Sequence, residues 1–261
     1  MAAEDLRPLV VSGAVAERIG AALAEGGEAR WVVVLPGRAP TARELDGASL
    51  LLHVVGGDRP KEEETKTFRL AARKSVPVVC ILAGGSPEAV TRVPYVLASD
   101  VIVTEPGSEI PLDAVVEHIA AGLGEKAYAL AGKLPALRRE VAERIVEQFA
   151  RQNAVLGAAI FVPGADLPVM TLNQIRMVLR LAGAHGQELD RERAVELLGV
   201  VGAGLGLRAV ARQILGLVPV AGWVVKGAVG YAGTKALGEA AIRYFDAGGL
   251  TAAAQSVRSR S

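Results

Sequence analysis

Aromatic side chains are scarce in this chain: they make up 4% of the 261 residues, although 51% of the residues are hydrophobic. The apolar content is therefore mostly small and aliphatic, which favours close packing of helices over a core of bulky rings. A single cysteine, Cys80, excludes an internal disulfide and suits a reducing compartment. The opening residues, MAAEDLRPLV, lack the basic segment and apolar core of a signal peptide, so we expect a cytoplasmic protein.

Nucleotide-binding motifs are also missing. A phosphate-binding loop needs Gly-x-x-x-x-Gly-Lys-Ser/Thr, but the one Gly-Lys pair, Gly132-Lys133, has Ala127 in place of the first glycine and no hydroxyl residue after the lysine. Guanine recognition uses Asn-Lys-x-Asp after a strand. The two asparagines, Asn153 and Asn173, both lie in the second half of the chain, where no strand is expected.

Other catalytic and metal-binding patterns are absent from the sequence as well. His53 lies inside an apolar strand, where we expect a core histidine with satisfied ring nitrogens. His118 and His185 have no cysteine or acid at metal-ligand spacing. Cys80 is expected to be a buried small hydrophobe, and Ser86 lacks the Gly-x-Ser-x-Gly pattern of a nucleophile. We therefore predict no catalytic, cofactor-binding or metal-ligating residue, and no cofactor.

The net charge of +1 hides an asymmetry between the two halves. Residues 1–125 hold 12 basic and 18 acidic side chains (−6), whereas residues 126–261 hold 17 and 10 (+7). This change of sign favours a domain boundary near residue 125. Two interpretations stay open: the basic half binds an anionic partner, such as a lipid surface or an acidic protein, or the two halves attract each other.

The first half alternates between continuous apolar strands and helices, a pattern typical of a parallel sheet covered on both faces. Strands are expected in WVVVLPG after Arg30 and over Leu9–Ser12, Ser49–Val55, Pro77–Leu82 and Asp100–Thr104, and helices over Val15–Ala24, 60–74, 87–98 and Ile110–Leu123. The fold class is therefore α/β, with a small Rossmann-like sheet.

The second half has no strand-like alternation, and its apolar residues recur at helical spacing. Helices are expected over 125–152, Thr171–Ala184, Arg193–Leu207 and from about Gly222 to Tyr244. The small, basic tail 250–261 is expected to be disordered. The second half is thus an all-α domain.

Charged residues interrupt the most apolar part of this helical half, at Arg208, Arg212, Lys226 and Lys235. A spanning helix needs about 20 apolar residues, so an ordinary transmembrane pair is disfavoured. Small residues nevertheless repeat every four positions within 227–240, as in Gly230, Thr234 and Gly238 or Ala228, Ala232, Ala236 and Ala240. Such ridges let helices pack closely, either in a soluble core or in lipid.

The region from about Asn153 to Gly249 resembles the bacterial family labelled domain of unknown function six-nine-seven, which includes the YcjF-like proteins. The matching pieces are Pro163–Asp166, the helix with Gln174 and Met177, His185-Gly186, Val218–Gly222, Ala232–Gly238 and Tyr244-Phe245. Members of that family are often fused to Era-like GTPase domains or associated with membranes.

The first half is similar to the later part of such a GTPase domain, which implies a G-domain-like fold. Val34-Leu35-Pro36-Gly37 stands where the GTPases have Asp-x-Pro-Gly, and Ala83–Ser86 stands where they have Asn-Lys-x-Asp. About 30 residues precede Trp31, too few for an intact phosphate loop, helix and switch region. The resemblance thus implies a truncated GTPase-like domain that has lost the residues for phosphate and Mg²⁺.

Together these patterns predict a degenerate GTPase-like domain over 1–125, a helical domain over 126–249 and the tail. We expect a non-enzymatic interaction or scaffold protein, with a protein partner that is a true GTPase acting in trans, no nucleic acid, and peripheral contact with the inner membrane. One alternative is a membrane-inserted hairpin over 197–244. Another is residual binding of a nucleotide or small molecule at the sheet edge, in the loops Pro36–Arg38, Gly56–Asp58 and Ala83–Ser86.

Overall fold

A computed structural model describes residues 6–159, 167–188, 191, 194, 195, 197 and 223–249. The predicted tail 250–261, most of the predicted helix Arg193–Leu207 and most of the proposed 197–244 hairpin lie outside these residues. The chain divides into two compact units, Met1–Glu140 and Val141–Ser261. Each unit is described by itself.

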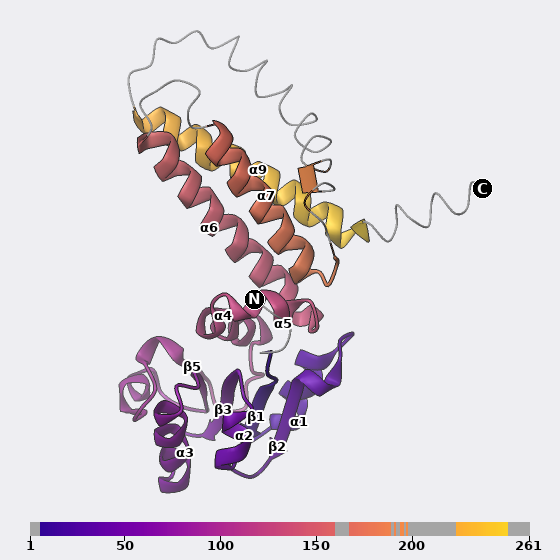
Figure 1. Ribbon diagram of the computed structural model, residues 1–261. Coiled ribbons are helices and arrows are strands. Elements are labelled where there is room, and N and C mark those ends of the chain that lie inside the picture. The colour runs from indigo at the N-terminus through magenta and orange to yellow at the C-terminus, as the bar shows by residue number, and fades with distance from the viewer. Residues whose placement is uncertain are drawn as a thin grey trace, which may run out of the picture. The chain divides into compact units, whose positions relative to one another are not determined.

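The first unit is built on a five-stranded parallel sheet, which confirms the α/β prediction (Figure 1). Its strands are β1 (Leu9–Gly13), β2 (Val32–Pro36), β3 (Leu50–Gly56), β4 (Val78–Ala83) and β5 (Val101–Thr104). Their order in the sheet is β2-β1-β3-β4-β5. The chain therefore leaves β1 towards one edge and returns to build the other side, which makes the gap between β1 and β3 the topological switch point.

Helices cover both faces of this sheet. They are α1 (Ala16–Ala24), α2 (Ala42–Asp46), α3 (Glu62–Arg73) and α4 (Leu112–Leu123). Phe68 and Ala71 of α3 are fully buried in one cluster with Leu51 and Leu82. On the opposite face, the close approach of Gly122 to Leu50 Cδ1 brings α4 onto β3. Because successive side chains of a strand point to opposite faces, a continuous apolar strand is what two covered faces require.

The connection between β4 and β5 differs from the expected helix over 87–98. Two 3₁₀ helices stand there instead, η3 (Pro87–Arg92) and η4 (Ala98–Asp100). Pro94 explains the difference, because a proline pushes the residue before it out of the helical region, and Val93 is extended (φ −90°, ψ 105°). Tyr95 then has a positive φ of 66° and is half exposed.

The expected helix over 125–152 is likewise interrupted. It is replaced by α5 (Lys126–Ala131), a 3₁₀ turn η5 (Pro135–Leu137) and α6 (Arg138–Ala159). Pro135 cannot continue a helix, and Gly132 weakens the turn before it. The Glu28 amide donates to the Lys133 carbonyl (3.1 Å), so this interrupted segment packs within the first unit.

Three long helices account for most of the described part of the second unit: α6, α7 (Leu167–Ala184) and α9 (Trp223–Asp246), which run alongside one another in Figure 1. A buried polar chain joins them. Asn173 Nδ2 donates to Asn153 Oδ1 (3.1 Å), and Asn153 Nδ2 donates to Thr234 Oγ1 (2.8 Å). Each helix contributes one member, so the chain fixes which faces of the three helices meet.

Two glycines allow α9 to approach α6 closely. A Cβ on Gly230 would lie 2.7 Å from the Asn153 carbonyl oxygen, and one on Gly238 would lie 2.4 Å from Val146 Cγ2. The ridge of Gly230, Thr234 and Gly238 is therefore packed against protein. Within the described residues, no helix combines the length and apolarity needed to cross a membrane.

Substituting these glycines tests the packing. We expect Gly230→Ala and Gly238→Ala to lower the free energy of unfolding by about 1–3 kcal/mol, because the new methyl groups collide with α6. Gly233→Ala on the same helix is the matched control, since nothing lies within 4 Å of its Cβ position. It should raise the free energy by about 0.5–1 kcal/mol, the usual gain over glycine in a helix. Urea denaturation followed by circular dichroism measures both, and equal effects at positions 233 and 238 would contradict the close contact.

Candidate functional site

The carboxyl edge of the parallel sheet is where an open α/β fold ordinarily binds ligands. The three loops named from the sequence, Pro36–Arg38, Gly56–Asp58 and Ala83–Ser86, all lie there because they follow β2, β3 and β4. The structure thus brings them to one edge. What they can do depends on whether their polar groups are available.

At the switch point the main chain of β1 closes onto β3. Gly13 has φ +91°, and a Cβ there would lie 2.2 Å from the Val54 carbonyl oxygen. That oxygen accepts a hydrogen bond from the Ala14 amide (3.2 Å). A phosphate-binding loop needs such amides to point at the ligand. At this position the amide is committed to the neighbouring strand.

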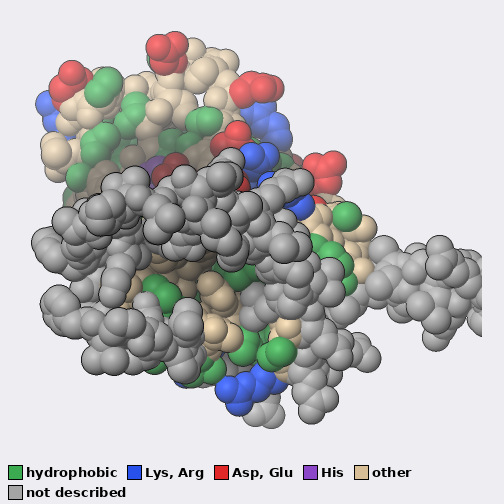
Figure 2. Space-filling model, turned by 90° about the horizontal axis from the view of Figure 1, so that it is seen from above, with side chains coloured by type: hydrophobic (Ala, Val, Ile, Leu, Met, Phe, Trp, Pro, Cys, Tyr) green, Lys and Arg blue, Asp and Glu red, His purple; other side chains and the backbone are tan. Residues whose placement is uncertain are grey.

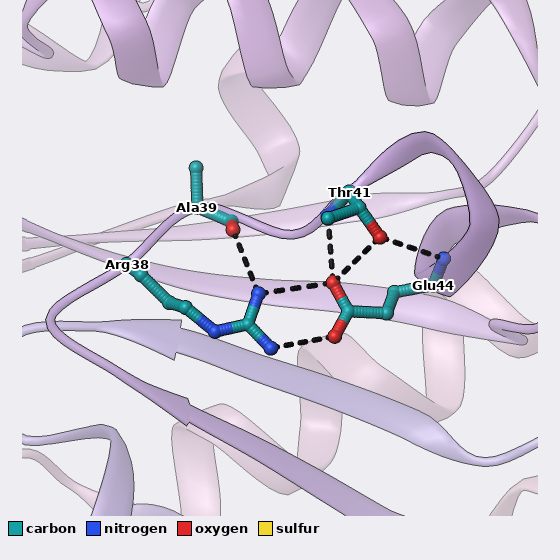
Figure 3. Close-up of polar contacts among 4 residues, drawn as sticks. All are labelled: Arg38, Ala39, Thr41 and Glu44. Atoms are coloured by element: carbon teal, nitrogen blue, oxygen red, sulfur yellow. Dashed lines mark hydrogen bonds and ion pairs between the residues drawn. The ribbon is translucent and has the colours of Figure 1, made fainter.

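The loop after β2 is tied by a network around Glu44 (Figure 3). Arg38 donates from both Nη atoms to the Glu44 carboxylate (2.6 and 3.0 Å), and the Thr41 amide and hydroxyl donate to the same carboxylate (2.7 and 2.8 Å). Thr41 and Glu44 form a capping box that starts α2. The Arg38 ion pair, followed by the Thr41 hydrogen bonds, lowers the pKa of Glu44 to about 2. Arg38, the cation of this loop, is therefore paired with Glu44 of the helix that follows the loop.

The loops after β3 and β4 are hydrogen-bonded to each other. The Ser86 amide donates to the Asp58 carboxylate, and this hydrogen bond is the main cause that lowers the pKa of Asp58. The Gly57 amide donates to the Ala83 carbonyl (2.8 Å), and the Gly84 amide donates to the Thr104 carbonyl (2.9 Å). These contacts use three of the main-chain amides at this edge.

His53 is buried, as expected, and both of its ring nitrogens have partners. Ser12 Oγ lies 2.8 Å from Nδ1, and Glu64 Oε1 lies 3.2 Å from Nε2. Since a carboxylate only accepts, Nε2 carries the proton and Ser12 donates to Nδ1. Burial, partly opposed by Glu64, lowers the pKa of His53. Ser12 and His53 are 0% and 2% exposed, so this Ser-His-Glu chain is closed to a substrate.

The remaining sequence candidates are also structural. Cys80 is fully buried, as expected, and burial raises the pKa of its thiol to about 12. His118 Nδ1 lies 2.7 Å from the Ala114 carbonyl oxygen, and His185 contacts Leu181 and Asp246. In the part of the chain that the structure describes, no three His, Cys, Asp or Glu side chains are grouped to hold a metal ion.

A second charged cluster, not foreseen from the sequence, joins α6 to α9. Glu147 accepts from the Tyr231 hydroxyl (2.8 Å), Arg151 Nε (2.7 Å) and Lys235 Nζ (3.3 Å). The Tyr231 hydrogen bond, then the two cations, lower the pKa of Glu147 to about 2. Tyr231 and Lys235 stand four residues apart on α9, a spacing visible in the sequence. Their meeting with Glu147, 84 and 88 residues away, depends on the tertiary packing.

Acidic and basic side chains are interspersed rather than separated by sign on the face drawn in Figure 2. Ion pairs among the described residues include Lys66–Glu62, Lys133–Glu28 and Arg151–Glu147. Much of the formal charge is therefore neutralised locally.

The protein is thus of the α/β class. It has a parallel sheet whose carboxyl-edge loops are hydrogen-bonded among themselves, and a helical module follows this sheet in the sequence. Residues 124–258 match the family described as Domain of unknown function (DUF697), more than half of the chain, and the chain belongs to that family. The match extends the resemblance expected over about 153–249. No curated protein and no solved structure matches the chain.

The Ser12–His53–Glu64 chain predicts a pH dependence of stability. Because the pKa of His53 lies below 6.5 in the folded protein, the unfolded chain takes up this proton first as the pH falls. The contribution of His53 to the free energy of unfolding is thus complete above pH 6.5 and decreases as the pH falls through the folded pKa.

NMR of the imidazole nitrogens checks this, with the His53 signals assigned by their loss in His53→Gln. We expect the ring to remain neutral at pH 6.5. The decline in stability between about pH 7 and pH 5 should be smaller in His53→Gln than in the wild type. A His53 ring that is already charged at pH 6.5 would contradict the burial argument.

Proposed function

We propose that this protein is a non-catalytic interaction or scaffold protein, in which a degenerate Era-like GTPase unit is joined to the DUF697 helical module. Its partner is a protein, and we favour a true GTPase that acts in trans. The chain would work at the cytoplasmic face of the inner membrane as a peripheral protein. None of its own residues would carry out a reaction.

The observation that carries this proposal is the closure of β1 onto β3. In an active GTPase the loop after the first strand must offer free amides and a lysine to the phosphates. Here the Ala14 amide is bonded to the Val54 carbonyl, and Gly13 leaves no space between the two strands. This contact takes the Ala14 amide out of the set of amides that a phosphate could use.

The strand arrangement supports the GTPase part of the proposal. Val34–Gly37, which stands where the GTPases have Asp-x-Pro-Gly, ends β2 beside β1. Ala83–Ser86, which stands in the place of the guanine-recognition motif, follows β4. Both segments thus lie at the edge that the resemblance expects, but their side chains lack the required charges and amides.

Nucleotide titration tests the proposal. We expect isothermal titration of the full chain with GTP and with GDP, in the presence of Mg²⁺, to give no binding heat. A genuine Era-like GTPase titrated with the same nucleotide solutions provides the positive control. If this chain bound GTP or GDP with micromolar affinity, the proposal that it has lost its nucleotide site would be wrong.

The partner is tested separately. The purified chain should capture at least one Era-like GTPase from the same genome, and capture should depend on whether that GTPase holds GTP or GDP. Absence of binding to all of them in both states would remove the GTPase partner from the proposal.

Membrane fractionation distinguishes a peripheral protein from an inserted hairpin. We expect an alkaline carbonate wash to release the chain from membranes, because the charges at Arg208, Arg212 and Lys226 make insertion of 197–244 costly. A marker with a known transmembrane helix should stay in the pellet. Retention of this chain with the marker would favour the hairpin instead.

A further inference from the structure

A cavity of about 300 Å³ lies at the amino edge of the sheet, opposite the edge considered above. Its walls come from the residues that precede three neighbouring strands: Arg7 before β1, Ser49 before β3, and Lys74 and Ser75 before β4. Lys126 at the start of α5 completes it. All of these residues belong to the first unit.

Every charged side chain that lines this cavity is a cation: Arg7, Lys74 and Lys126. The Asp46 side chain pairs with Lys74, and the main-chain oxygen of Asp46 accepts a hydrogen bond from Arg7. The Asp46 side chain is 61% exposed. Three cations thus line the cavity and no acid lines it, and Lys126 has no partner among the described residues.

The segments that carry the cations are held in place by the sheet. The Ser49 hydroxyl donates to the Arg7 carbonyl (2.6 Å), and the Ser49 amide donates to the Pro8 carbonyl (2.9 Å). The Val76 amide donates to the Ala71 carbonyl (3.0 Å). The main chain before β1, β3 and β4 is therefore already ordered before a ligand arrives, which limits the conformational entropy lost on binding.

Ser75 is an unusual residue for its position. It follows the end of α3 with φ +54°, a conformation that glycine adopts at no cost and other residues adopt with strain. A serine there adds a hydroxyl group to the cavity wall. This hydroxyl has no hydrogen-bond partner among the described residues, so it is available to a ligand.

We propose that this cavity binds a phosphate group, either inorganic phosphate or a small phosphomonoester. A phosphate dianion is attracted by these three cations and accepts hydrogen bonds in several directions, which suits two lysines, an arginine and a hydroxyl. Val76 and Ala48 give the cavity an apolar wall that an ester's carbon atoms would contact. The site is independent of the proposed loss of nucleotide binding, because it lies at the opposite end of the strands.

The test is a titration of the full chain with inorganic phosphate and with phenyl phosphate, followed by calorimetry and by amide NMR. We expect saturable 1:1 binding of phosphate, with the largest shifts at Arg7, Ser75 and Lys126. Tighter binding of phenyl phosphate identifies an ester as the ligand type, and equal or weaker binding identifies the free ion. Absence of saturable binding by both probes would overturn the proposal.

Variants locate the site. Lys126→Gln should weaken phosphate binding about tenfold, the effect expected from losing one charge-assisted contact. Lys66→Gln is the matched control, because Lys66 is an exposed lysine of α3 outside the cavity. Ser75→Gly separates binding from folding: it should raise the Tm by relieving the positive φ while weakening phosphate binding. Equal affinities in the wild type, Lys126→Gln and Ser75→Gly would contradict the location.

The two acidic residues that precede Leu6 in the sequence provide a further test of whether the ligand is external. Glu4 and Asp5 precede Leu6, which lines the cavity. If phosphate binds only to the variant with Glu4→Gln and Asp5→Asn, the cations serve the chain's own carboxylates and the proposal fails. Comparable binding by the wild type and this variant supports an external ligand.

Discussion

The arrangement of β1 and β3 in the α/β unit depends on the close contact between Gly13 and the Val54 carbonyl. β1 pairs with both β2 and β3, so its carboxyl end lies between the ends of those two strands. Only a residue without a Cβ can bring the β1 chain this close to β3. The Ala14 amide then pairs with the Val54 carbonyl, so this amide is not free at the point where a doubly wound sheet usually receives a ligand.

The helical unit depends on a comparable constraint. Gly230 and Gly238 let α9 approach α6, and the approach places Thr234 within hydrogen-bond distance of Asn153. Two buried amides and a hydroxyl would be costly without partners, so their mutual pairing specifies one arrangement of α6, α7 and α9. The Glu147 cluster repeats the α6–α9 link nearer the surface. Packing of small residues, rather than bulky aromatic contacts, thus explains how a chain with so few rings forms a helical module.

Sequence reasoning predicted the strands well because continuous apolar runs such as Leu50–Val55 are bounded by glycines. It failed where a proline changed a local helix, at Pro94 and Pro135, although both prolines were visible. The pairing of Ser12 with His53 could not be predicted, since it depends on the register of two strands 41 residues apart. The Arg38–Glu44 network could have been found, because Thr41 and Glu44 show the capping-box spacing. The cavity at the amino edge needs four chain segments to meet, which no local pattern reveals.

Hydrogen exchange at the Ala14 amide tests the central claim most directly. If β1 is closed onto β3, this amide exchanges slowly, as do the sheet amides beside it, and adding GTP or GDP leaves its rate unchanged. Rapid exchange in the free protein would contradict the closure. A nucleotide-dependent change in the rate would mean that the edge opens to a ligand, against the account of a scaffold without a nucleotide site.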